Sequence, residues 1–199
     1  VGYLLLGIAA LARVNGGEAV SVATMHLAAN GVMLHIVAYA AANITVFLAI
    51  TTIYKTPGNE VLSGLAGLGR RSPFLAMVLA ASVLSLAGLP VFAGFVSKFY
   101  LFTAAATQGL LWLVGLAIFT SLISLYYYLQ ILRQMYIEPV VDDTPVPISN
   151  LVLVVLGILF AGTVFIGIYP APLVDAIQYA SDAISTMSSG GVEFAHTLD

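Results

Sequence analysis

Long apolar runs, separated by polar stretches, dominate the pattern of this chain. A helix that crosses a membrane needs roughly 20 apolar residues at a rise of about 1.5 Å per residue. The pattern predicts helical spans over five apolar segments: residues 1–12, 31–54, 73–106, 110–132 and 151–169. We therefore expect residues 1–170 to form one transmembrane helix bundle.

The segment 73–106 does not have the length of an ordinary span. Its roughly 34 residues would make a helix of about 51 Å, too long for a hydrocarbon core of about 30 Å and too short for two crossings. A single crossing places Lys55, Arg70, Arg71 and Arg133 on one face, whereas two crossings split these cations between both faces. Because the excess of Lys and Arg marks the inner face of a membrane, we predict one crossing with the cations on the cytoplasmic or matrix side.

This segment also contains the residues that interrupt a helix. Pro90 lacks an amide hydrogen and clashes with the carbonyl four residues earlier, and Gly88 and Gly94 offer little resistance to unwinding. We predict a break at these three residues, so that the crossing is discontinuous. A continuous, proline-kinked helix packed through small residues is the alternative that this pattern leaves open.

Residues 171–187 show the period of an amphipathic helix. Because the segment has no Lys or Arg to attract anionic lipid, we expect it to pack on protein. Residues 188–199 are expected to form a mobile or partner-held tail. The apolar face of the helix recurs at steps of four and three: Leu173, Ile177, Ala180, Ile184 and Met187.

Composition narrows the class of protein. Of the 199 residues, 61% are hydrophobic and 8% are charged, against about 25% charged residues in an ordinary soluble domain. The predicted fold class is therefore an all-α integral membrane protein. The net charge of -3 and the lack of a basic stripe exclude nucleic acid as a partner. The absence of cysteine excludes a cysteine-ligated iron-sulfur or zinc site in this chain.

The first residues, VGYLLLGIAAL, have no basic n-region and no small-residue cleavage site. They are typical of the middle of a helix rather than of a signal peptide. We expect the polypeptide to be part of a longer membrane unit, or a separately encoded half of one.

Lys98 is the one ionisable side chain other than tyrosine between Arg71 and Arg133. An ammonium in hydrocarbon costs several kcal/mol, so an intramembrane lysine is by default a candidate functional residue. Snorkelling to the headgroups is the alternative, but Lys98 lies about 12 Å from the helix end near Ala106, and a lysine side chain spans only about 6 Å. Burial disfavours the charged form of an amine, which suits Lys98 to relaying a proton. The spans contain no carboxylate, so we expect a partner to supply one.

His35, Tyr39 and Asn43 recur at intervals of four and share one stripe of the second span. Histidine titrates near neutral pH, and tyrosine and asparagine can order a chain of water, so the stripe suits a proton pathway. Hydrogen bonds that hold neighbouring helices together are the alternative. Ser97, directly before Lys98, is a further candidate for this pathway.

Other chemistry leaves no signature in the sequence. Tyr126, Tyr127 and Tyr128 lie near the cation-bearing face and fit an interfacial aromatic belt. There is no dinucleotide-binding or phosphate-binding loop, and no pair of metal ligands has a useful spacing. We therefore expect neither a cofactor nor a metal in this chain.

The stretch around the lysine is specific enough to indicate a family. Residues 72–102, SPFLAMVLAASVLSLAGLPVFAGFVSKFYLF, resemble the LSLAGIPPLAGFxGKFYLF signature of the antiporter-like subunit N of respiratory complex I. The later SLYYYLQILRQMY resembles the next helix of that family, and Tyr39, Asn43 and Phe47 fit its YxxxNxGxF pattern. The resemblance covers residues 1–175.

The chain departs from the family pattern at three positions. Val91 replaces the second proline, and Ser97 and Thr45 stand where glycine is usual. Pro90 and Gly94 remain, so the break is retained while its course is left open.

The resemblance implies the C-terminal part of the second of two inverted five-helix repeats. It implies Lys98 as the proton relay on the discontinuous helix, with His35, Tyr39, Asn43 and Ser97 along the pathway. In this family, NADH, flavin mononucleotide (FMN), iron-sulfur clusters and quinone are bound by other subunits. The implied partners are lipids and the other membrane-arm subunits, including the chain with the missing N-terminal repeat. The implied location is the mitochondrial inner membrane or the bacterial plasma membrane, with several crossings.

The expected function is therefore that of a proton-translocating membrane subunit of NADH:quinone oxidoreductase. Two alternatives stay open. One is a subunit of a multisubunit cation/proton antiporter or of a membrane-bound hydrogenase, which share the LAGxPxxxGFxxK architecture. The other is a scaffold remnant that conducts no protons.

Overall fold

A computed structural model describes residues 2–12, 22–54, 62–140 and 144–180. Within these ranges the chain forms helices joined by loops, with no strand, which confirms the predicted all-helical class. Residues 171–180 are also helical, whereas the rest of the expected amphipathic helix and the tail lie outside the described residues. The named helices are α1 (Gly2–Ala12), α2 (Val22–Ile53), η1 (Leu62–Leu65), α3 (Leu68–Arg71), α4 (Pro73–Ala87), α5 (Ala93–Thr107), α6 (Leu111–Tyr136) and α7 (Asn150–Ile168).

Three of these helices, α2, α6 and α7, are long and apolar enough to cross a membrane. The helix α2 begins at Val22, earlier than the segment 31–54 that hydropathy marks. The added turns contain good helix formers, such as Ala28, which is also buried against α1 and α5. Hydropathy marks the part of a helix that lipid contacts, and the helix itself continues beyond it.

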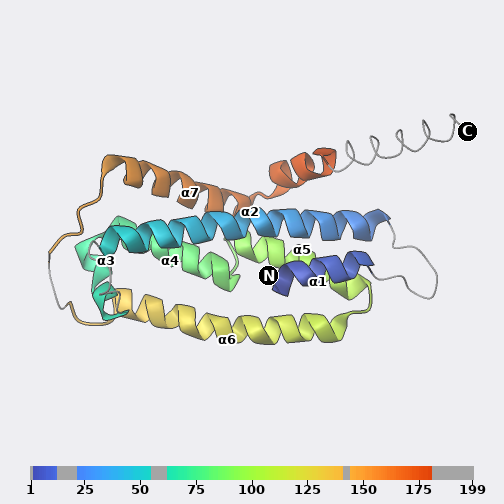
Figure 1. Ribbon diagram of the computed structural model, residues 1–199, viewed down its shortest axis with the longest axis horizontal. Coiled ribbons are helices and arrows are strands. Elements are labelled where there is room, and N and C mark those ends of the chain that lie inside the picture. The colour runs from blue at the N-terminus through green and yellow to red at the C-terminus, as the bar shows by residue number, and fades with distance from the viewer. Residues whose placement is uncertain (1, 13–21, 55–61, 141–143, 181–199) are drawn as a thin grey trace, which may run out of the picture.

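The helices α4 and α5 follow one another along the length of α2 (Figure 1), and α2 packs against both of them. The helix α4 ends at Ala87 and α5 begins at Ala93, so one path across the bundle is made of two half-helices. The discontinuous helix expected from the sequence is therefore present, and a continuous kinked helix is not formed.

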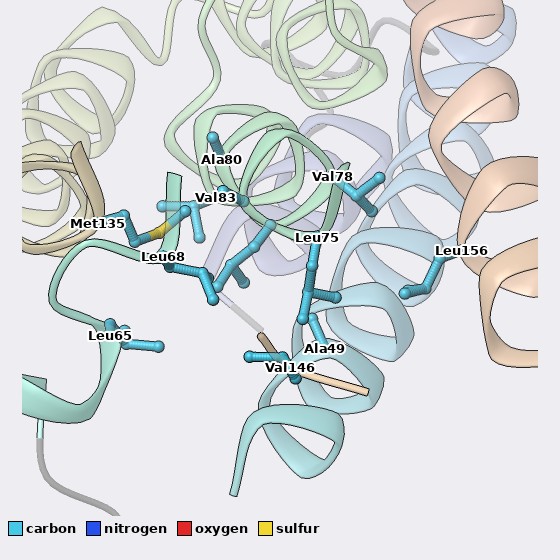
Figure 2. Close-up of a cluster of buried hydrophobic side chains, with 12 residues drawn as sticks. Ala49, Leu65, Leu68, Leu75, Val78, Ala80, Val83, Met135, Val146 and Leu156 are labelled. Atoms are coloured by element: carbon cyan, nitrogen blue, oxygen red, sulfur yellow. The ribbon is translucent and has the colours of Figure 1, made fainter. Parts of the chain in front are cut away.

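Two apolar clusters hold the bundle together at its two ends. The first joins the C-terminal half of α2 to α3, α4, α6 and α7, and Figure 2 shows Leu75 of α4 near its centre. The second joins α1, the N-terminal half of α2, α5 and the start of α6 around the fully buried Leu101. The break between α4 and α5 lies between these clusters, so polar groups there are enclosed by apolar packing on both sides.

Glycines bring α1, α2 and α5 close together in the second cluster. A Cβ added to Gly31 of α2 would lie 3.0 Å from the backbone nitrogen of Leu101, and one added to Gly7 of α1 would lie 2.6 Å from its Cδ2. Small residues of this kind let helix backbones approach closely in a membrane. The position of α5 relative to α2, and hence of Lys98 relative to His35, depends on this contact.

The loops at the α3 end of the bundle are fastened by arginines. The guanidinium of Arg71 donates to the carbonyl oxygens of Thr144 (3.1 Å) and Gly64 (3.4 Å). Arg133, near the end of α6, forms an ion pair of 3.1 Å with Glu138. The helix α3 contacts α6, so both arginines belong to the same end of the bundle (Figure 1). Lys55 lies outside the described residues.

Candidate functional site

The amine of Lys98 lies at the break between the two half-helices. The side chain is 6% exposed, and its Nζ donates hydrogen bonds to the carbonyl oxygens of Leu86 (3.0 Å) and Ala87 (2.9 Å) and to Oγ of Ser121 (3.1 Å). It is thus directed toward the end of α4 and not along α5 toward Thr107, where a snorkelling lysine would have to reach.

The end of α4 explains why two carbonyl groups are free to receive the lysine. The last four carbonyls of a helix have no partner within it. Gly88, with φ 85°, donates to Ser85 O (3.0 Å) and Leu89 donates to Leu84 O (3.1 Å), which is a Schellman cap. The remaining two carbonyls are those that accept from Lys98.

The same contacts favour the charged form of Lys98. A helix C-terminus carries a partial negative charge, which stabilises a nearby cation. The amine also lies 4.6 Å from the centroid of the Tyr3 ring, within the range of a cation–π interaction. The ammonium is therefore stabilised by dipoles and a ring face, since the helices α1 to α7 contain no carboxylate.

The start of α5 is held by a residue of α4. The backbone nitrogen of Gly94 donates to Oγ of Ser85 at 3.1 Å, so Ser85 satisfies one of the free amides at the beginning of α5. A Cβ at position 94 would overlap the carbonyl oxygen of Ser85, so only glycine allows this approach. Val91 in the connection has φ 82°, a value that the proline usual at this place in the signature cannot adopt.

His35 reaches the same region from the middle of α2. It is 6% exposed, and its Nδ1 lies 3.1 Å from Oγ of Ser97. With the Ser97 hydroxyl donating to Gly94 O at 3.0 Å, the contact between His35 and Ser97 favours the tautomer in which Nδ1 carries the hydrogen. In the neutral ring Nε2 is then the proton acceptor.

A cavity of about 600 Å³ connects these groups. It lies between α1, α2, α4, α5 and α6, and Lys98 and His35 both line it. The rings of Tyr3 and His35 are 5.5 Å apart, and those of His35 and Tyr39 are 5.9 Å apart and stacked. The polar side chains around the cavity are Tyr3, His35, Tyr39, Ser85, Lys98, Thr120, Ser124 and Tyr128.

A smaller cavity of about 200 Å³ also borders the lysine. Lys98 and Ser121 are the polar side chains that line it, and the rest of the lining is apolar, including Phe95 and Phe99. Lys98 is the side chain that lines both cavities.

The structure brings together most of the candidates from the sequence. Lys98, His35, Tyr39 and Gly94 line the larger cavity and Gly88 the smaller one, and Ser97 bonds to His35. The amide of Asn43 donates to Tyr39 O on its own helix, and neither Asn43 nor Pro90 lines these two cavities.

Sequence reasoning missed several members of the site. Tyr3 and Ser85 gave no periodic signal in their helices. Ser121 and Ser124 stand in the stretch SLISLYYYL, where polar residues at helical spacing on α6 were a usable signal. Tyr128, expected in an aromatic belt, lines the larger cavity. Among the described residues, no group of three or more His, Cys, Asp or Glu could hold a metal ion.

A helix interrupted in the middle of an apolar bundle, with an ionisable side chain at the break, defines a transporter-type membrane protein. The chain crosses the membrane several times. Residues 3–124 match the family described as NADH:quinone oxidoreductase/Mrp antiporter, transmembrane. This chain belongs to that family.

Curated relatives confirm the resemblance to subunit N. The chain is 34% identical to NADH-quinone oxidoreductase subunit N of Heliobacterium modesticaldum, covering 92% of this chain and 36% of the relative. It is 36% identical to subunit N of Desulfitobacterium hafniense, covering 92% of this chain and 38% of that relative. It is 40% identical to subunit N 2 of Acidobacterium capsulatum, covering 85% of this chain and 32% of that relative. The chain thus spans about a third of the length of these relatives.

Solved structures show the same fold in several complexes. A chain of respiratory complex I from Thermus thermophilus matches with a TM-score of 0.68 and 25% identity, covering 88% of this chain and 43% of that one. A chain of the membrane-bound sulfane sulfur reductase, an archaeal respiratory membrane complex, matches with a TM-score of 0.70 and 24% identity. The match covers 91% of this chain and 40% of that one. A chain of the Mrp complex from a Dietzia species matches with a TM-score of 0.72 and 22% identity. The match covers 88% of this chain and 39% of that one. The last two likenesses show the shared fold alone.

Proposed function

We propose that this chain is the C-terminal part of a proton-translocating membrane subunit of NADH:quinone oxidoreductase, with Lys98 as its proton relay. The observation that carries the proposal is the placement of Nζ at the helix break, beside a cavity that His35 also lines. The subunit N relatives favour this enzyme over other members of the family. Its location is then an energy-transducing membrane, the mitochondrial inner membrane or the bacterial plasma membrane.

In the proposed mechanism, Lys98 alternates between ammonium and neutral amine. The carbonyls of Leu86 and Ala87 and the Tyr3 ring stabilise the ammonium. A cavity of about 600 Å³ is large enough for several waters, which would carry the released proton to Nε2 of His35. Ser97 acts by holding the ring so that this nitrogen is the acceptor.

Proton release needs a change of charge near the lysine. The helices α1 to α7 have no carboxylate to provide it, so the change comes from another part of the assembly. We propose that the N-terminal repeat of the family provides this change of charge, and that the remaining membrane-arm subunits and lipids surround both repeats. NADH, flavin, iron-sulfur clusters and quinone would be bound elsewhere in the complex.

Replacing Lys98 tests the relay in the assembled, membrane-reconstituted complex. We expect Lys98→Ala and Lys98→Arg to abolish this chain's proton transfer, measured as protons translocated per NADH oxidised. Alanine has no titratable group, and arginine retains the charge but does not release its proton. Both variants should still assemble and reduce quinone. Unchanged pumping in an intact complex would refute the relay and favour a scaffold role.

A second candidate is a subunit of a multisubunit cation/proton antiporter, since the description of the matching family names the Mrp antiporter beside NADH:quinone oxidoreductase. The two candidates differ in what accompanies the chain. Copurification with flavin, iron-sulfur clusters and quinone reductase activity is expected for the oxidoreductase. Cation/proton exchange by a complex without these groups would instead identify the antiporter.

A further inference from the structure

Ser121 on α6 forms two hydrogen bonds at the break. Its Oγ accepts from Nζ of Lys98 at 3.1 Å, and its hydroxyl donates to Ala87 O at 3.2 Å. It lines the smaller cavity together with the lysine. A single hydroxyl group of α6 therefore forms hydrogen bonds to both half-helices, to Ala87 of α4 and to Lys98 of α5.

The protonated lysine is fully satisfied by this arrangement. An ammonium has three N–H donors and no acceptor. The three donors have three partners: the carbonyls of Leu86 and Ala87 and the hydroxyl oxygen of Ser121. In this state each of the three partners acts as an acceptor.

The neutral lysine requires something different. A neutral amine has two N–H donors and a lone pair that needs a donor, and a buried polar group without a partner is costly. Carbonyl oxygens only accept, so Leu86 and Ala87 cannot serve the lone pair. A hydroxyl both accepts and donates. Of the three partners of Nζ, Ser121 alone can turn its hydrogen toward the amine.

We propose that Ser121 is a positioning residue that reverses its hydrogen bond with Lys98 when the lysine loses its proton. In the charged state the serine accepts from Nζ and donates to Ala87 O. In the neutral state it donates to Nζ, while the two carbonyls keep the remaining N–H groups. The amine then changes its charge without leaving the break. This inference rests on the proposed function of Lys98. It adds the Ser121 hydroxyl as the group that satisfies the hydrogen bonds of both the charged and the neutral amine at the helix break.

The other ionisable groups near the lysine do not perform this role. Tyr3 presents its ring to Nζ, and His35, Tyr39 and Tyr128 line the larger cavity without a hydrogen bond to the amine among those that the described residues form. The helices α4 and α7, which pack on α5, contain no ionisable side chain, and α5 adds only a tyrosine. The smaller cavity has no ionisable group other than the lysine.

The test compares variants that keep or remove the hydroxyl at position 121 in the reconstituted complex. Ser121→Thr keeps the hydroxyl, whereas Ser121→Val has nearly the shape of threonine and lacks it. We expect the threonine variant to translocate protons at close to the native rate and the valine variant to be about tenfold slower, since one hydrogen bond to a charged group changes an equilibrium by about this factor. Quinone reduction, measured beside proton translocation over a range of pH, reports whether the two remain coupled. Antibody detection of the subunits reports whether the complex has assembled.

Two further variants distinguish the effect of losing the hydroxyl group from the effect of changed side-chain packing. Ser121→Ala also removes the hydroxyl but only shrinks the side chain, so it should assemble and be slowed like the valine variant. Thr103→Val is the matched control, because the Thr103 hydroxyl donates to Phe99 O on its own helix, and it should pump normally. If the alanine variant pumps normally, or the threonine and valine variants are equally slow, Ser121 acts through its size and the inference is wrong. If Lys98→Ala pumps normally, the proposed function itself is wrong.

Discussion

Gly88 shows how one residue can serve both the backbone and the lysine. Its φ of 85° ends α4 in the left-handed region, which side chains other than glycine adopt only at a cost. In addition, a Cβ at this position would lie 2.8 Å from Cδ of Lys98. Gly109, in the turn before α6, also has a positive φ, of 69°, but has nothing within 4 Å of the place of a Cβ.

Alanine at these two glycines separates backbone strain from displacement of the lysine. Both Gly88→Ala and Gly109→Ala should lower the free energy of unfolding by about 1–2 kcal/mol because of the left-handed backbone. Only Gly88→Ala should also reduce proton translocation, since it pushes Lys98 away from the carbonyls of α4. Thermal unfolding in detergent and pumping by the reconstituted complex measure the two effects. Equal pumping by the two variants would contradict this account of Gly88.

At the scale of helices, the break is stable because each half-helix completes the other. The lysine of α5 takes the last carbonyls of α4, and Ser85 of α4 takes an amide at the start of α5. Lipid offers no hydrogen-bond partner to such groups, so irregular backbone survives only where it is buried in protein or lines a water-filled cavity. Each half-helix thus supplies hydrogen-bond partners that the other half-helix needs at the break.

Two serines of α4 test this reciprocal capping. Ser85→Ala removes the partner of Gly94 N and should lower the free energy of unfolding by about 1 kcal/mol, the usual loss for a helix cap. Ser82 is also buried, but its hydroxyl donates to Val78 O within α4, so Ser82→Ala should change stability by much less. The shift in thermal unfolding between the two variants is the measurement. The capping role of Ser85 fails if both substitutions have the same effect.

The sequence predicts the break but not its partners. Gly88, Pro90 and Gly94 interrupt a helix through properties of their own residues. Ser121 is 23 residues from Lys98 in the chain, and nothing in a serine of an apolar helix tells which of its neighbours it will meet. For Asn43 the sequence suggests a partner that the structure does not provide. Its helical spacing from His35 predicts a shared polar stripe, but its side-chain amide donates a hydrogen bond to Tyr39 O of its own helix.

Over the whole molecule, the arginines of α3 and the last turn of α6 lie at one end of the bundle, and the turn after α5 lies at the other (Figure 1). With the single discontinuous crossing that we predict, these ends lie on opposite faces of the membrane. Because the arginines mark the inner face, the turn after α5 is expected at the outer face.

Cysteine labelling checks this topology, since the chain has no cysteine of its own. Ser63, Thr107 and Ile137 are exposed and can each be replaced by cysteine. With one crossing, a membrane-impermeant maleimide should label Ser63→Cys and Ile137→Cys from the inner face and Thr107→Cys from the outer face. Labelling of Ser63→Cys and Thr107→Cys from the same face would mean two crossings and would overturn the arrangement.

What the sequence alone determined are properties carried by single residues and their spacing: a helical membrane protein, an interrupted span and a buried lysine. Hydropathy and helix breaking are local effects, so they can be read in one dimension. Only the tertiary structure decided that Lys98 meets the end of α4, that Ser121 completes its hydrogen bonds, and that His35 shares its cavity. The physical reason is that buried polar groups must find partners, and helix packing determines which partners are within reach.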